Sequence, residues 1–180
     1  MKYLLVLAAV LGLVAIGSAN SFAATDVYMQ YGTIKGDSTS ADHPNWIELS
    51  SYQFDVSKPV TIGGTGTQES GKTQISAITI TKPMDSSSTQ LMEQAFAGEG
   101  QTVKIDLVKS GGTGPMTYGE YVLSNAIVSG YSISSGGDVP AESIDISFTK
   151  ITFTYTPQNP DGSAGTPSEV SWNFATNSPN

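Results

Sequence analysis

The sequence contains no cysteine and no arginine, and its only histidine is His43. Without cysteine no disulfide can form, so apolar burial and strand pairing have to hold the fold. Arginine is the side chain that grips phosphates and guanine edges through two parallel hydrogen bonds. Its absence from a chain with a formal net charge of −8 argues against nucleic acid binding.

Residues 1–23 have the pattern of a secretory signal peptide. Lys2 precedes an apolar run over residues 3–16, and small residues follow. A membrane-spanning helix needs about 20 apolar residues, whereas this run ends sooner. We therefore predict cleavage near Ala23 or Ala24.

The remaining chain, residues 24–180, is predicted to form one exported domain in the periplasm, at the cell surface or outside the cell. Because Lys2 is one of the eight lysines, this domain keeps 7 lysines against 16 acidic residues, a formal charge of −9. No contact with a membrane is expected after cleavage.

Alternating apolar and polar residues predict a domain of seven or eight β-strands. The alternation changes parity between Phe148 and Ile151, which predicts a bulge or bend near Thr149 and Lys150. We also expect Tyr155 and Trp172 to be mostly buried, between the last two strands or against a neighbouring subunit. The predicted strands are 27–34, 46–57, 73–82, 101–109, 118–134, 142–156 and 169–174.

Residues 84–100 break the β pattern and predict the one helix of the mature chain, Ser87 to Ala97. Asp85 and the following serines offer N-cap oxygens, and Gly98 suits a left-handed C-terminal position. Four apolar residues share one face of this helix: Leu91, Met92, Ala95 and Phe96. The predicted fold class is therefore all-β with one helix, as a compact barrel or two facing sheets.

The stretch KGDSTSADHPNW, residues 35–46, holds the residues that most resemble a metal or acid–base site. Zinc needs three or four ligands, and a lone His43 without cysteine supplies too few. Asp37 and Asp42 lack the regular spacing of a calcium loop. Pro44 ends the stretch, and we predict a polar turn between two strands.

Other motifs for chemistry are weak. Gly66 to Lys72, followed by Thr73, fits the spacing of a phosphate-binding loop, but the next segment is an alternating β pattern where a helix is required. We predict a glycine-rich hairpin tip instead. No serine has a recognisable base and orienting acid, whereas a catalytic pair of carboxylates stays open as an alternative.

Three longer segments follow one another in a specific order. The first, residues 27–56, joins two strands through an IKGDS turn, and the second, residues 71–99, runs from a strand through a lysine-containing turn into the helix. The third, residues 142–174, has a long strand ending in Tyr155, a PQNPDG loop and a strand with Trp172. Together they resemble the Hcp (haemolysin-coregulated protein) family, which builds the inner tube of type VI secretion systems.

The resemblance implies a ring-forming domain that assembles into hexamers, and rings that stack into a hollow tube carrying a secreted cargo protein. It implies no enzyme activity, no cofactor and no metal. The loop from Ser57 to Lys72 would reach a neighbouring ring, and the helix would lie outside or at a subunit contact. The residues predicted at these contacts are Ser57, Lys58, Gly63, Gly64, Thr65, Gly66 and Lys72 in the loop, and Leu91, Met92, Glu93 and Phe96 in the helix.

The predicted signal peptide departs from the family, because tube-forming members are loaded from the cytoplasm and lack one. The resemblance therefore supports the family's fold more strongly than the family's role in secretion. The alternative function is a monomeric exported binding or adhesion module, with residues 63–72, 110–116 and 157–167 as its recognition loops.

Overall fold

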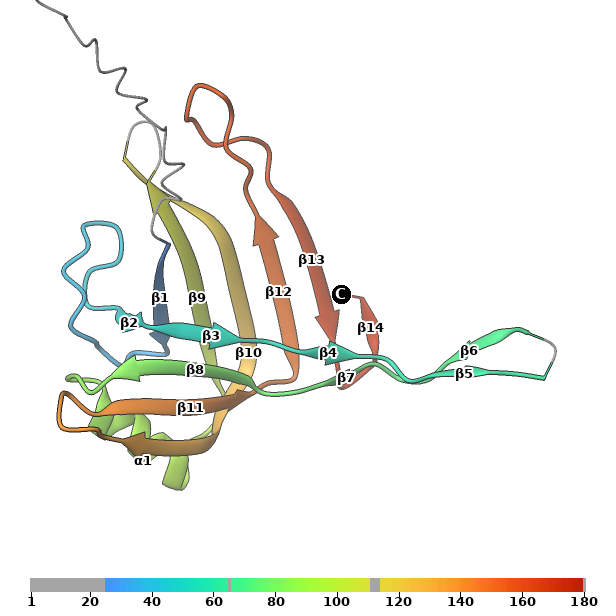
Figure 1. Cartoon of the computed structure of the whole chain (residues 1–180), viewed down its shortest axis with the longest axis horizontal. Helices are drawn as coiled ribbons and strands as arrows, with labels where there is room; N and C mark the ends of the chain where they lie inside the picture. The colour runs from blue at the N-terminus through green and yellow to red at the C-terminus, as the bar shows by residue number, and fades with distance from the viewer. Residues whose placement is uncertain (1–24, 65, 111–113, 180) are drawn as a thin grey trace, which may run out of the picture.

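The computed structural model describes residues 25–64, 66–110 and 114–179, so the predicted signal peptide lies outside the described residues. Within these ranges the chain is mostly β-strand with a single helix (Figure 1). The predicted fold class is confirmed. None of the helical residues described forms a segment long and apolar enough to cross a membrane.

The elements follow the chain from β1 to β14 with the helix between β8 and β9. Their bounds are β1 (Asp26–Tyr31), β2 (Ile47–Leu49), β3 (Ser51–Gln53), β4 (Val56–Ser57), β5 (Val60–Ile62), β6 (Gln68–Ser70), β7 (Gln74–Ile75), β8 (Ile78–Pro83), α1 (Ser88–Ala97), β9 (Gln101–Ser110), β10 (Pro115–Ser134), β11 (Ala141–Ser147), β12 (Lys150–Tyr155), β13 (Ser168–Asn173) and β14 (Ser178–Pro179).

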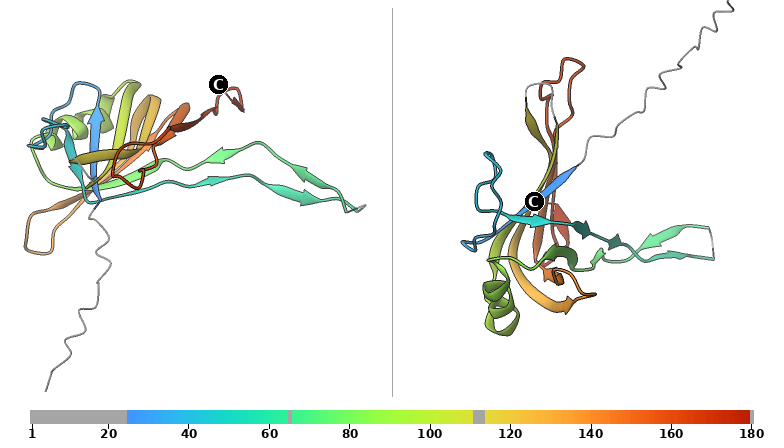
Figure 2. Two further views of the ribbon diagram at one scale, coloured as in Figure 1. Left: turned by 90° about the horizontal axis from the view of Figure 1, so that it is seen from above. Right: turned by 60° about the vertical axis from the view of Figure 1, so that its left-hand side comes forward.

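The long strand β10 belongs to two layers of antiparallel strands. Its first half pairs with β9 and β12, in a first layer ordered β2-β1-β9-β10-β12-β13-β14. Its second half pairs with β11, in a second layer ordered β10-β11-β8-β3. The register of β10 shifts between Leu123 and Ala126, where Asn125 has a φ of 52°. Figures 1 and 2 show β10 curving from one layer into the other.

The core lies between the two layers. Met29, Ile105, Tyr121, Phe153 and Val170 stand in register across five strands of the first layer, on its apolar face. The second layer and α1 close much of this face with fully buried side chains. These are Ile78 and Ile80 of β8, Leu91 of α1, and Ile144 and Ile146 of β11.

The predicted change of parity is a change of layer. The segment predicted as one strand, residues 142–156, divides into β11 in the second layer and β12 in the first, with Phe148 and Thr149 between them. Phe148 is buried and keeps contact with the core through this bend. The predicted bend near Thr149 and Lys150 is confirmed.

The helix begins one residue later than predicted and ends where expected. Asp85 accepts hydrogen bonds from the backbone N–H and the hydroxyl of Ser87, while Ser87 itself makes no side-chain cap. The prediction of a left-handed Gly98 is wrong, because its φ is −74° and its ψ is 150°. Glycine fits there because an added Cβ would lie 2.4 Å from the carbonyl oxygen of Gln94.

Candidate assembly surfaces

The stretch around His43 is a turn, as predicted. Backbone hydrogen bonds close it: Gly36 N–H donates to Asn45 O at 2.9 Å, and Ser38 N–H donates to Trp46 O at 3.0 Å. Gly36 packs so closely that a Cβ would lie 2.5 Å from the Trp46 carbonyl oxygen. The turn is therefore closely packed and closed by its own backbone hydrogen bonds.

The His43 side chain joins this turn to the first layer through contacts with β1 and β9. The sequence did not indicate these contacts. Its imidazole stacks parallel on Tyr28, and the ring centroids are 4.6 Å apart. His43 Nε2 lies 2.8 Å from Asp106 Oδ2 of β9, and both residues are buried. The pair joins the turn to β9, which gives it a place in the packing of the fold. Among the described residues, no three His, Cys, Asp or Glu side chains gather where they could hold a metal ion.

A second buried polar cluster fixes α1 to the second layer. Lys82 Nζ lies 2.6 Å from Glu142 Oε2 and 2.8 Å from Asp85 Oδ1, and it donates to Ser88 Oγ at 3.2 Å. The Tyr131 hydroxyl donates to Glu142 Oε1 at 2.6 Å. Burial, together with the neighbouring Glu142, raises the pKa of Tyr131. The start of the helix thus has one fixed position relative to β8, β10 and β11.

The predicted inter-ring loop is a hairpin arm, residues 57–72, built from β5 and β6. It stands away from the two layers in every view (Figures 1 and 2). Gly63, Gly64 and Gly66 form its tip, where Gly66 has a φ of 78°. Ser57, Lys58 and Lys72 lie exposed at its base, and Thr65 lies outside the described residues.

The arm carries an apolar face that sequence reasoning missed. Val60 is 55% exposed and Ile62 is 73% exposed. Because side chains alternate along a strand, both lie on the same face of the arm, next to their register partners Ser70 and Gln68. The alternation Val60-Thr61-Ile62 was the available signal, but it was hidden among glycine, threonine and lysine residues.

The predicted contact residues of α1 divide into two groups. Leu91 is fully buried in the core, so it supports the fold and is not available to a neighbouring subunit; its assignment to a contact was wrong. Glu93 is exposed and Met92 is half-buried. Phe96 is 81% exposed, an unusual position for a large aromatic side chain.

The apolar face of the first layer extends beyond what the second layer covers. We call Phe153, Tyr155 and Val170 the apolar flank: Phe153 is half-buried, Tyr155 is 43% exposed and Val170 is 62% exposed. Trp172 is half-buried against the core. The expectation that Tyr155 is buried between the last two strands was wrong, since the exposed fraction of this residue is large. Its burial against a neighbour stays a prediction.

Comparisons with known proteins agree with this geometry. A family model described as "Type VI secretion system effector, Hcp" matches residues 28–155. The chain belongs to the Hcp family. Among curated protein sequences, none matches it.

Solved structures of Hcp-type proteins share the fold. A structure described as a type six secretion system protein is 30% identical, with a TM-score of 0.80 over 87% of this chain and 100% of that one. Hcp1 from Salmonella typhimurium is 20% identical, with a TM-score of 0.73 over 87% and 99% of the two chains. A type VI secretion system effector from Yersinia pestis is 21% identical, with a TM-score of 0.67 over 82% and 99%.

Proposed function

We propose that this Hcp protein is an exported structural subunit. It assembles with copies of itself into a hexameric ring, and the rings stack into a hollow tube or filament that carries a secreted cargo protein. In this proposal the protein acts through its shape and its contact surfaces, and it catalyses no reaction. The observation that carries the proposal is the pair of uncovered apolar surfaces, on the arm and on the apolar flank.

Uncovered apolar surface of this kind favours association. Burial of apolar area contributes about 25 cal/mol per Å². Clustered exposed apolar residues on a soluble protein mark an interaction site more often than single ones do. Tyr155 and Val170 lie on adjacent strands in the first layer, so a neighbouring copy can cover them together. The apolar flank is the proposed contact within a ring.

The opposite face of the first layer suits a water-filled lumen. Glu120, Thr154 and Glu169 stand in register across β10, β12 and β13. Tyr28 and Asp106 continue this row on β1 and β9, where the turn that holds His43 covers them. The carboxylates and hydroxyl of the uncovered part stay hydrated, so in our proposal this part of the face lines the tube and the cargo passes along it.

The test is the assembly state of the exported protein. The full chain is expressed with its signal sequence and recovered from the exported fraction, then measured by light scattering after size exclusion and by negative-stain electron microscopy. The proposal expects a mass of six subunits and ring-shaped particles, with stacks at higher concentration. Monomers at every concentration and salt would reject it and favour the binding or adhesion module.

A further inference from the structure

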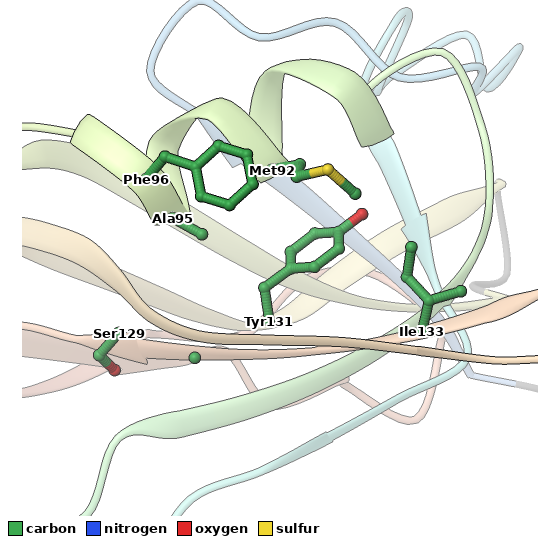
Figure 3. Close-up of a pocket in the computed structure, with 7 residues that line it drawn as sticks. Met92, Ala95, Phe96, Ser129, Tyr131 and Ile133 are labelled. Carbon is green, nitrogen blue, oxygen red and sulfur yellow. The ribbon is translucent and has the colours of Figure 1, made fainter.

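A groove opens between α1 and the second half of β10. Met92, Ala95 and Phe96 of the helix face Tyr131 and Ile133 of the strand across it (Figure 3). The hollow has a volume of about 520 Å³. Ile133 is 44% exposed at one side and Phe96 is 81% exposed at the other, so both walls present apolar surface to solvent.

The arm offers a surface of matching chemistry. Its apolar face presents Val60 and Ile62, flanked by the uncharged Ser70 and Gln68, while Glu69 points to the other face with Thr61. No charge would therefore have to be desolvated if this face entered an apolar groove.

The charges around the two surfaces are also complementary. Lys58 and Lys72 stand at the base of the arm, which has one acidic residue, Glu69. The segment from Ser88 to Gly100 carries Glu93 and Glu99 and no cation. Complementary charges at the rim of a contact fix its orientation and speed its formation.

The arm cannot fill the groove of its own chain. Figures 1 and 2 show the arm extending from one end of the molecule and α1 at the other. A strand advances about 3.3 Å per residue, so the arm reaches roughly 20 Å beyond its base. This reach suits a surface on another copy.

We infer that the groove between α1 and β10 is the receptor for the arm of a second copy, with Val60 and Ile62 seated against Met92, Phe96 and Ile133. This inference rests on the proposed self-assembly and names the surface that receives the arm. Because the arm and the groove are different surfaces at opposite ends, the contact is head-to-tail. A head-to-tail contact that does not close into a ring leaves free arms and free grooves at the ends of the assembly, so it can repeat along a stack.

Engineered cysteines test this contact directly, because the natural chain has none. Ile62→Cys in the arm is mixed with isotope-labelled Ile133→Cys in the groove wall, and the assembled protein is oxidised mildly. The matched control replaces Ile133→Cys with Ile127→Cys, on the same strand, 40% exposed and outside the groove. A disulfide needs Cα atoms within about 7 Å, so only a seated arm gives the mixed product.

The expected result is a labelled–unlabelled dimer, joined between positions 62 and 133, in several-fold excess over the 62–127 product. Equal yields of the two products, or rings and stacks without the 62–133 product, would overturn the inference and leave the proposed function standing. Monomers under all conditions would overturn both. Co-purification of a different polypeptide in the groove, protecting Ile133→Cys from alkylation, would also overturn it.

A second measurement does not depend on cross-linking. Phe96→Ser and Ile62→Ser each remove an exposed apolar side chain, so both variants are expected to keep the fold. Each should shorten the stacks seen by electron microscopy while single rings persist. If the double variant has no larger effect than either single one, the two residues act at one contact. If the two substitutions shorten the stacks additively, the residues act at separate contacts, and this result would contradict the inference.

Discussion

Lys82 and Glu142 show how a single ion pair can fix the position of the helix. Both side chains are about 1% exposed, and their charges meet at 2.6 Å with Asp85, Ser88 and Tyr131 around them. Such a pair contributes little net stability over an apolar replacement, because desolvating two charges offsets their attraction. Losing one partner is different, because it leaves a charge buried alone.

Lys82→Met should therefore destabilise the protein strongly, by about 3–5 kcal/mol. The double variant Lys82→Met with Glu142→Leu removes both fully buried charges and should recover part of that loss, because Asp85 keeps its hydrogen bonds from Ser87 whereas the Tyr131 hydroxyl loses its acceptor. Urea unfolding followed by tryptophan fluorescence measures both. Equal stabilities of the single variant and the natural protein would mean that the pair is open to water.

Four tyrosines predict how the stability of the protein depends on alkaline pH. Burial raises the pKa values of Tyr28, Tyr31, Tyr121 and Tyr131 above the usual value of 10.0. Because the folded state holds these protons more tightly than the unfolded state, their contribution is complete below pH 10 and is lost as the pH rises through the folded pKa values. The urea concentration at the midpoint of unfolding should stay constant between pH 8 and pH 9.5 and should fall at higher pH.

The matched variant for this effect is Tyr131→Phe. It removes one of these four titrating groups, so the decline of its stability above pH 10 should be shallower, although its stability at pH 8 is lower by about 1–3 kcal/mol from the lost hydrogen bond to Glu142. Parallel declines in the two proteins would assign the alkaline loss to other groups.

At the scale of elements, the bend of β10 decides how the layers meet. Asn125 has a positive φ of 52° at the point where the register shifts, a conformation that asparagine tolerates better than most residues. Asn125→Ala should cost about 1 kcal/mol, whereas Asn125→Gly should cost little. Thermal unfolding of both variants tests this, and a more stable alanine variant would show that the bend does not depend on the left-handed residue.

The elements also show what the sequence could predict. Alternation placed the long strands, and the parity change at Phe148 marked the bend, because both follow from which side chains are buried. The division of residues 46–57 into β2, β3 and β4 was not predictable, since each short strand pairs with a different partner in space: β1, β8 and β7. The His43–Asp106 pair joins residues 63 apart in the sequence, and only the fold brings them together.

For a similar reason, the sequence located the segments that hold the candidate contact residues but not the exposure of each side chain. The family resemblance located the arm and the helix, but it did not say which side chains face solvent. Phe96 points outward whereas Leu91, on the same predicted apolar face, is buried. A helix of ten residues that packs against only part of a sheet cannot bury a whole apolar stripe.

At the scale of the whole molecule, the apolar flank should control ring formation. Val170→Lys places a charge in the proposed contact, while Val170 is 62% exposed in the single chain, so monomer stability should change by less than about 0.5 kcal/mol. The expected result is monomers in light scattering. Glu169→Lys, at the next residue on the opposite face, is the matched control and should keep the rings. Intact rings in the Val170→Lys protein would move the ring contact elsewhere.

The path of β10 through both layers has a consequence for how the molecule comes apart. Because both layers pair with the same 20-residue strand, we expect them to unfold together in one transition. The amides in the first half of β10, flanked by β9 on one side and β12 on the other, should then be the last to exchange with deuterium. A subunit under tension in a filament would hold its shape until this one strand yields, and would then unravel all at once.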